Sequence, residues 1–95
     1  MGFEVRDVPD LGRYEARSED GLAGYARYAQ GAGDLFVFTH TEVLPAYEGQ
    51  GLGGTLVRGA LDDVRRRGGR IEAQCPFVRS WLERHAEYQD LLACT

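Results

Sequence analysis

Residues 48–54 read EGQGLGG and lie between an extended run that ends near Pro45 and an amphipathic helix. The four glycines among residues 49–54 allow the backbone to approach a ligand closely. A helix that begins directly after them directs its unpaired N–H groups, and the positive end of its dipole, toward the same place. This combination predicts a phosphate-binding loop in which backbone amides, rather than side chains, hold the ligand.

The chain before this loop has the pattern of short strands separated by turns. Strands are expected over residues 3–8, 13–17, 22–29 and 35–44, with a hairpin turn at Asp20-Gly21. Both faces of the run 35–44 are apolar at its start, so this strand is expected to be central and covered on both sides. Regular alternation places Phe36, Phe38, His40 and Glu42 on one of its faces, and Leu35, Val37, Thr39, Thr41 and Val43 on the other.

After the loop, apolar residues recur with the period of a helix. A strand is expected over residues 70–75, a helix from Pro76, and a last helical or turn-like piece over residues 85–92. This order predicts an α+β fold with an α/β-type core, in which a mixed, largely antiparallel sheet contains one βαβ crossover. The length suits a single domain over residues 1–95. The apolar helix residues are Leu52, Leu56, Val57, Ala60, Leu61 and Val64.

Composition narrows the classes of function. Residues 1–48 carry nine acids against four arginines, and residues 49–95 carry six acids against seven arginines. No basic surface is expected to cover the molecule, so nucleic-acid binding is not predicted, whereas an acidic first half favours a cationic partner such as an amine. The sequence shows no apolar signal segment and no membrane-length run, and Cys75 and Cys94 are expected to be reduced thiols. A cytoplasmic location without a membrane partner follows as the expectation.

Two other phosphate-binding motifs compete for the same glycines. A P-loop would place a lysine where Thr55 stands, so it is rejected. In the dinucleotide-binding fold the first glycine follows its strand almost at once, whereas residues 45–48 intervene here. That interpretation is therefore not favoured, although Glu72 stands near the expected ribose-binding position. The fingerprint GxGxxG itself is matched by Gly49, Gly51 and Gly54.

The segment that begins at Pro45, PAYEGQGLGGTLVRGALDDVRRRG, resembles the acetyl-CoA signature of the GCN5-related N-acetyltransferases, in which [Q/R]-x-x-G-x-[G/A] opens a helix. The pattern falls on residues 48–53, with Glu48 at its first position. The segment CPFVRSWLERHAEYQDLL, which begins at Cys75, extends the resemblance to a compact subgroup with a cysteine at the end of the last strand. The helical segment that usually separates the first two strands of this family is missing.

The resemblance implies a binding mode for acetyl-CoA as co-substrate. The pantetheine arm would pair with the strand end at Thr41, Val43 and Leu44. The pyrophosphate would meet the backbone at Glu48, Gly49, Gln50, Gly51, Leu52, Gly53 and Gly54. The ribose phosphate or adenine would contact Arg79, Arg84 and His85.

Three side chains are candidates for the chemistry. Cys75 precedes Pro76 at a helix N-terminus, which favours a thiolate that could accept the acetyl group, but a buried small hydrophobe is the alternative. His40 and Glu42 could take the proton of an attacking amine, or they could be a satisfied histidine and a surface charge. The histidines and cysteines lack the spacing of metal ligands, so no metal is expected.

The function implied by the resemblance is that of an acetyl-CoA-dependent N-acetyltransferase. The enzyme would move an acetyl group to a small-molecule or peptide amine, directly or through Cys75. Because the segment that shapes the acceptor site is missing, a non-catalytic CoA-binding or interaction module is the alternative. An exposed first strand could pair with a second copy, so a monomer or a weak dimer is expected.

Overall fold

The strands of the sheet follow one another in sequence order. The computed structural model describes residues 3–93, and its five strands pair in the order β1-β2-β3-β4-β5. The first three pairs are antiparallel and the β4–β5 pair is parallel. The predicted fold class is confirmed, with α1 as the βαβ crossover. The elements are β1 (Glu4–Val8), η1 (Pro9–Leu11), β2 (Arg13–Ser18), β3 (Gly21–Gln30), β4 (Leu35–Val43), η2 (Pro45–Tyr47), α1 (Leu52–Arg66), β5 (Arg70–Ala73), α2 (Pro76–Glu83) and η3 (Ala86–Leu91).

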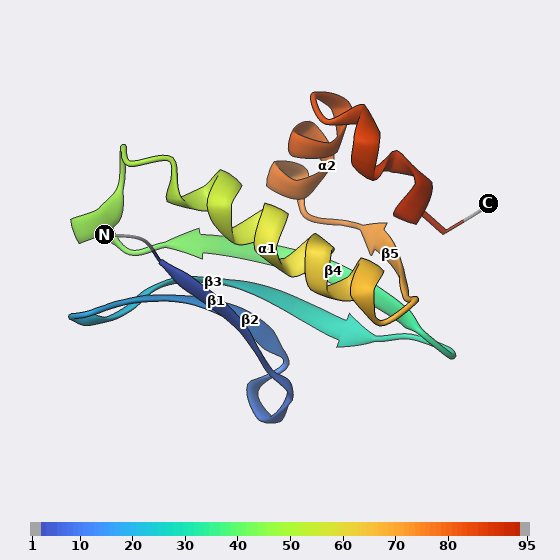
Figure 1. The fold of residues 1–95 in the computed structure, drawn as a ribbon, viewed down its shortest axis with the longest axis horizontal. Helices are drawn as coiled ribbons and strands as arrows, with labels where there is room; N and C mark the ends of the chain where they lie inside the picture. Colours follow the sequence, from blue (N-terminus) through green and yellow to red (C-terminus); the bar gives the residue numbers. More distant parts are fainter. Residues whose placement is uncertain (1–2, 94–95) are drawn as a thin grey trace.

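Both α-helices lie on the same side of the sheet (Figure 1). The six apolar residues of α1 that were expected to share a face are all buried. They form one core with the contacting rings of Tyr14, Tyr28 and Phe38 from the sheet. Gly59 brings α1 close to β1, because a Cβ atom at this position would lie 2.8 Å from the Val5 side chain.

A β-bulge interrupts β4 at Thr39. Arg27 of β3 is paired with His40, but the next residue, Tyr28, is paired with Phe38. Thr39 is therefore an extra residue without a partner on β3, which is the definition of a bulge. From this point onward the alternation of side chains along β4 is shifted by one residue.

The bulge changes which side chains of β4 share a face. The prediction of regular alternation along residues 35–44 is wrong, because it placed Phe38 on the same face as His40. In the structure His40 and Glu42 lie on the face away from α1. The residues of β4 that face α1 are Phe36 and Phe38 before the bulge, and Thr41 and Val43 after it.

The face of the sheet away from α1 carries no helix within residues 3–93 (Figure 1). Leu35 and Val37 lie on this face and are only partly buried. The expectation that β4 is covered on both sides is therefore wrong. We call this surface the open face; it is defined by the outward residues of β1 to β4, which include Arg6, Arg13, Glu15, Arg17, Tyr25, Arg27, His40 and Glu42.

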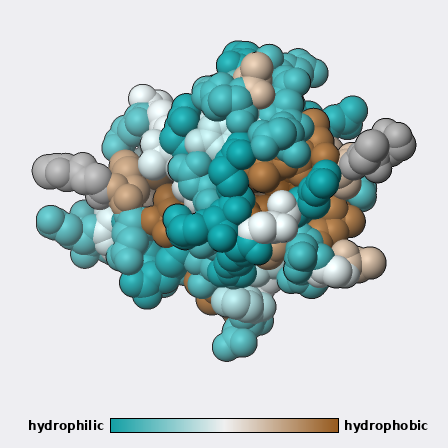
Figure 2. Space-filling model, turned by 45° about the vertical axis from the view of Figure 1, so that its right-hand side comes forward, coloured by the Kyte–Doolittle hydropathy of each residue, from teal (hydrophilic) through white to brown (hydrophobic). Residues whose placement is uncertain are grey.

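The surface of the molecule is mainly polar. Most of the face visible in Figure 2 is hydrophilic, with apolar areas confined to a few places. Two hollows beside β5 share Ala73 and Leu92 in their lining. No helix within residues 3–93 is both long enough and apolar enough to cross a membrane.

A polar cluster fastens the C-terminal end of α1 to the sheet. The Tyr14 hydroxyl donates to Asp63 at 2.7 Å, and the Tyr28 hydroxyl donates to Asp7 at 2.6 Å. Arg67 joins the two pairs, because it lies 2.8 Å from Asp7 and 3.0 Å from Asp63. Burial, together with the hydrogen bond to a carboxylate, raises the pKa of both tyrosines. The two hydroxyls therefore stay protonated and keep donating at neutral pH.

The stability of the fold should fall at alkaline pH, and Tyr14 should account for part of the loss. A group with a raised pKa in the folded state contributes its full stability below the pKa of the unfolded chain, about 10 for tyrosine, and loses it as the pH rises toward the folded value. We expect Tyr14→Phe to lower the free energy of unfolding by about 1 kcal/mol at neutral pH. Above about pH 10, each further pH unit should lower the free energy of unfolding of the variant by about 1.4 kcal/mol less than that of the parent.

Urea unfolding of both proteins across this pH range provides the measurement. Tyr25→Phe is the control, since the Tyr25 hydroxyl makes no side-chain hydrogen bond to a carboxylate of residues 3–93. The explanation fails if Tyr14→Phe and Tyr25→Phe lose stability with pH equally fast.

Candidate functional site

The glycine loop leads into a helix start without a cap. Gly49 and Gly51 have φ angles of +83° and +73°, a region that side chains rarely adopt. Gln50 between them does not have a positive φ, so the sign of φ alternates along the loop. Such alternation turns successive N–H groups toward one side and forms a concave site for an anion. Because no side chain caps the first turn of α1, its amides are left for a ligand.

The remaining glycines of the loop serve close packing and access. A Cβ atom at Gly53 would lie 2.7 Å from the ring of Phe77, so the start of α2 lies directly on the start of α1. A Cβ atom at Gly54 would meet Trp81 Nε1 at 3.5 Å, which is an ordinary contact. A side chain at position 53 would therefore displace the ring of Phe77, whereas one at position 54 would meet only an ordinary contact.

β5 parts from β4 immediately after Phe38. The carbonyl oxygen of Phe38 accepts hydrogen bonds from the N–H groups of both Gln74 and Cys75, at 2.9 and 3.0 Å. The last paired residues of the two strands are Phe38 and Ala73. The part of β4 that follows, residues 39–43, has no β5 partner on this edge. An unpaired strand edge can take up an additional extended chain.

The polar groups on this edge belong to Thr41 and Val43. The N–H of Leu44 donates to the carbonyl of Ala23 in β3 at 2.9 Å. Since the backbone groups of successive strand residues point to opposite sides, those of Val43 and Thr41 point to the unpaired side. The Leu44 carbonyl also accepts the N–H of Tyr47 at 2.8 Å. The expectation that Leu44 pairs with a pantetheine arm is therefore corrected, because both of its backbone groups already have partners.

Cys75 lies where the two strands separate. Its side chain is buried with 3% exposure, and it is the residue that precedes the first turn of α2. The Sγ atom lies 3.4 Å from the Thr41 hydroxyl, across the opening between β4 and the start of α2. The structure therefore brings Cys75 together with Thr41. Cys94 lies outside the described residues.

His40 and Glu42 form a pair on the open face. Nε2 of His40 lies 3.0 Å from Oε1 of Glu42, and the two side chains are 56% and 45% exposed. The bulge at Thr39 places this pair on the opposite side of β4 from Thr41. The structure therefore does not bring His40 and Cys75 together. No group of three side chains that could hold a metal ion occurs within residues 3–93.

A groove of about 540 Å³ begins at the glycine loop and follows α1. Trp81 and His85 form one wall, with their rings stacked at a centroid distance of 3.8 Å. Arg58 extends into it, 5.5 Å from the Trp81 ring, and donates to the Tyr88 hydroxyl at 3.2 Å. Of the three residues expected to contact a nucleotide, only His85 lines this groove. Its lining is Phe3, Val5, Gly51, Gly54, Thr55, Arg58, Gly59, Asp62, Trp81 and His85.

Comparison with known proteins assigns this arrangement to a family. Residues 13–91, most of the chain, match the GCN5-related N-acetyltransferases. The chain belongs to this family. No curated protein resembles the chain closely enough to count as a match.

Solved structures of this acetyltransferase family have the same fold. A GCN5-like protein of Staphylococcus aureus is 22% identical with a TM-score of 0.72, and the match covers 97% of this chain and 89% of that one. A Bacillus subtilis acetyltransferase in complex with CoA is 19% identical with a TM-score of 0.57, covering 76% and 63% of the two chains. The Salmonella typhimurium protein yncA with acetyl-CoA is 28% identical with a TM-score of 0.51, covering 68% and 42%. The chain thus spans less than two thirds of the last two proteins.

Two residues beside the glycine loop were not predicted from the sequence as ligand contacts. They are Arg58 of α1 and Trp81 of α2, which both line the groove. Arg58 lies beside the glycine loop because it follows Gly54 by four residues, about one helical turn. Extending the glycine positions along the helix at this spacing would have identified Arg58. The position of Trp81 depends on how α2 packs on α1, which no local pattern gives.

The glycines of the loop should respond differently to alanine. Gly51→Ala places a Cβ atom in the left-handed region and should lower the free energy of unfolding by about 1–2 kcal/mol, although nothing lies within 4 Å to clash with it. Gly54→Ala should instead raise it by about 0.5–1 kcal/mol, since alanine is the better helix former and the contact with Trp81 is ordinary. Chemical denaturation measures both. Equal effects of the two substitutions would show that the loop does not have this backbone conformation.

Proposed function

We propose that the protein binds acetyl-CoA and transfers its acetyl group to a small-molecule or peptide amine. The observation that carries this proposal is the unpaired edge of β4, which lies between the amides of the glycine loop and the thiol of Cys75. An extended coenzyme arm fits an unpaired edge, and a diphosphate fits the uncapped start of α1. The complexes of the Bacillus subtilis protein with CoA and of the Salmonella typhimurium protein with acetyl-CoA support the assignment of this ligand.

Each part of the coenzyme has a proposed position. The pyrophosphate binds the amides of residues 49–54, where its charge interacts with the helix dipole. The amides of the pantetheine arm pair with the outward backbone groups of Thr41 and Val43. The nucleotide end lies in the groove along α1, where the Arg58 guanidinium is available to a phosphate. Arg79 and Arg84 lie outside this groove, so we transfer their expected contacts to Arg58 and His85.

Titration of ¹⁵N-labelled protein with CoA tests the binding mode. The amide resonances of residues 49–54 and of Val43 should shift. Pantetheine alone, which lacks the pyrophosphate, should shift Val43 and leave the loop nearly unchanged. Residues of β1 such as Arg6 are the internal control. Loop resonances that stay in place at saturating CoA, in a correctly folded sample, would refute the proposal.

Direct transfer requires an unprotonated amine, whose nitrogen lone pair lies next to the thioester. The amine gives a proton to the His40–Glu42 pair, either directly or through a water. Its nitrogen, now neutral, forms a bond to the acetyl carbon, and the bond from that carbon to sulfur breaks. The nitrogen then loses a second proton, which the CoA thiolate takes up, and the His40–Glu42 pair returns the first proton to solvent. The exposed position of the pair on the open face is consistent with an amine that arrives from solvent.

Transfer through Cys75 would need a base within reach of its thiol. The side chain that hydrogen-bonds to Sγ within residues 3–93 is that of Thr41, whose hydroxyl is not a base, whereas His40 lies across β4. We therefore propose that Cys75 lines the acetyl site and that transfer is direct. Cys75→Ala should keep its turnover within about tenfold of the parent, because a positioning contact of one side chain is worth about 1 kcal/mol.

Intact-mass spectra taken with acetyl-CoA and no acceptor complete this test. Neither protein should carry an acetyl group in these spectra. A labelled parent protein, with loss of both label and turnover in Cys75→Ala, would assign the covalent route instead. Binding of CoA without turnover on any amine would identify a binding module.

A further inference from the structure

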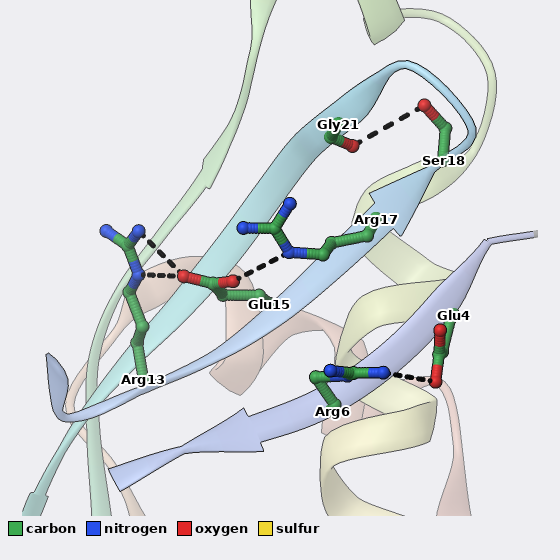
Figure 3. Close-up of polar contacts among 7 residues, drawn as sticks. All are labelled: Glu4, Arg6, Arg13, Glu15, Arg17, Ser18 and Gly21. Carbon is green, nitrogen blue, oxygen red and sulfur yellow. Dashed lines mark hydrogen bonds and ion pairs between the residues drawn. The ribbon is translucent and has the colours of Figure 1, made fainter. Parts of the chain in front are cut away.

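One cation that β1 to β4 place on the open face has no carboxylate partner within residues 3–93. Arg27 is exposed in β3 and forms no ion pair with any residue between 3 and 93. The other charges of this face are matched, as Figure 3 shows for the buried carboxylate between two guanidinium groups of β2. The matched pairs are Arg6–Glu4, Arg13–Glu15, Arg17–Glu15 and His40–Glu42.

The unpaired guanidinium of Arg27 lies next to the proposed base. Arg27 and His40 are direct partners across β3 and β4. Both lie against the ring of Tyr25: the Arg27 guanidinium carbon is 5.8 Å from its centroid, and the His40 ring is 6.4 Å away. Glu42 is the cross-strand partner of Tyr25. A cation and a carboxylate therefore stand at diagonal positions of one strand pair, about 7–8 Å apart at the backbone.

Most of the acids in the first half of the chain lie away from Arg27. Asp7 faces away from it and is held by Arg67. The acids that make residues 1–48 negative lie mostly in turns and in the short η1, at Asp10, Glu19, Asp20, Asp34 and Glu48. A polyamine or a basic peptide would thus meet the unpaired Arg27 beside the proposed reaction centre, and like charges repel.

We propose that the acceptor is an amine with an anionic oxygen group a few bonds from its nitrogen, as in a free α-amino acid. The anion binds Arg27, and the amine nitrogen lies at the His40–Glu42 pair. The guanidinium offers two parallel N–H groups to a carboxylate or a phosphate, and the short spacing of an amino acid matches neighbouring positions on two strands. This inference rests on the proposed acetyl transfer and names its acceptor class.

The test compares matched acceptors in the presence of acetyl-CoA. L-Alanine and alaninamide differ in the carboxylate, phosphoethanolamine replaces the carboxylate by a phosphate, and spermidine represents a polyamine. Release of CoA should favour L-alanine over alaninamide and spermidine by at least about tenfold. Arg27→Gln should raise the KM for L-alanine by a similar factor and leave that for alaninamide unchanged. Preference for phosphoethanolamine over L-alanine would identify a phosphate as the anion.

Two variants separate a binding role of Arg27 from a structural one. Arg27→Lys keeps the charge but loses the two parallel N–H groups, so it should restore only part of the affinity for L-alanine. Arg6→Gln removes another guanidinium of the same face, one that is already paired with Glu4, and should change nothing. The NMR spectrum of each variant is recorded first, to establish that the variant is folded. Equal use of L-alanine and alaninamide, or an unchanged KM in Arg27→Gln, would overturn the inference.

A binding measurement keeps this result distinct from failure of the proposed transfer. With saturating CoA, L-alanine should shift the amide resonances of Arg27 and His40, and the shift should disappear in Arg27→Gln. If L-alanine binds in this way but no CoA is released, the anion site stands and the acetyl transfer is wrong. If neither L-alanine nor phosphoethanolamine binds, the anion site is wrong whether or not other amines are acetylated.

Discussion

The separation of β5 from β4 is the constraint on which the rest of the structure depends. One carbonyl, that of Phe38, accepts the N–H groups of both Gln74 and Cys75, and pairing stops there. Beyond it the outer edge of β4 is unpaired for the length of residues 39–43, although strand edges normally find a partner or are covered. The same strand leads through η2 into the glycine loop. The separation of β5 from β4 therefore creates both the unpaired edge of β4 and the opening between the two strands, and this edge leads toward the start of α1.

The bulge at Thr39 determines which side chains of β4 lie on each side of this opening. Because it shifts the alternation of β4 by one residue, Thr41 faces Cys75 on the α1 side while His40 and Glu42 reach the open face. A regular strand would have placed His40 on the side of the core residues Phe36 and Phe38. A thioester lying in the opening would thus have a buried thiol on one side and a solvent-exposed base on the other, which suits an acceptor that approaches from the open face.

The sequence predicted the elements well and their irregularities poorly. The helix of α1, the parallel crossover and the glycine loop follow from period, turn residues and glycine content, which are local properties. The bulge at Thr39 is not, because strict alternation of Phe36, Phe38 and His40 is also the pattern of a regular strand. The burial of Cys75 and the place of Trp81 depend on how α2 packs. Net charge has a related limit: five of the nine acids in residues 1–48 lie in turns and in η1, so a count along the chain does not tell which charges lie beside Arg27.

The two ends of α1 are stabilised differently, which allows a small domain to contain a glycine loop that lowers its stability. Gly53 and Gly54 in the first turn, without a side-chain cap, leave the N-terminal end poorly stabilised by its own residues, because glycine is the least favourable ordinary residue in a helix. The opposite end is held by buried hydrogen bonds of Tyr14 and Asp63 and by Arg67, which reaches Asp7 in β1. Between them, six buried apolar residues fix the helix on the sheet. Stability is thus concentrated where no ligand is expected, and the amides at the start of the helix stay available because packing farther along, rather than capping, holds α1 in place.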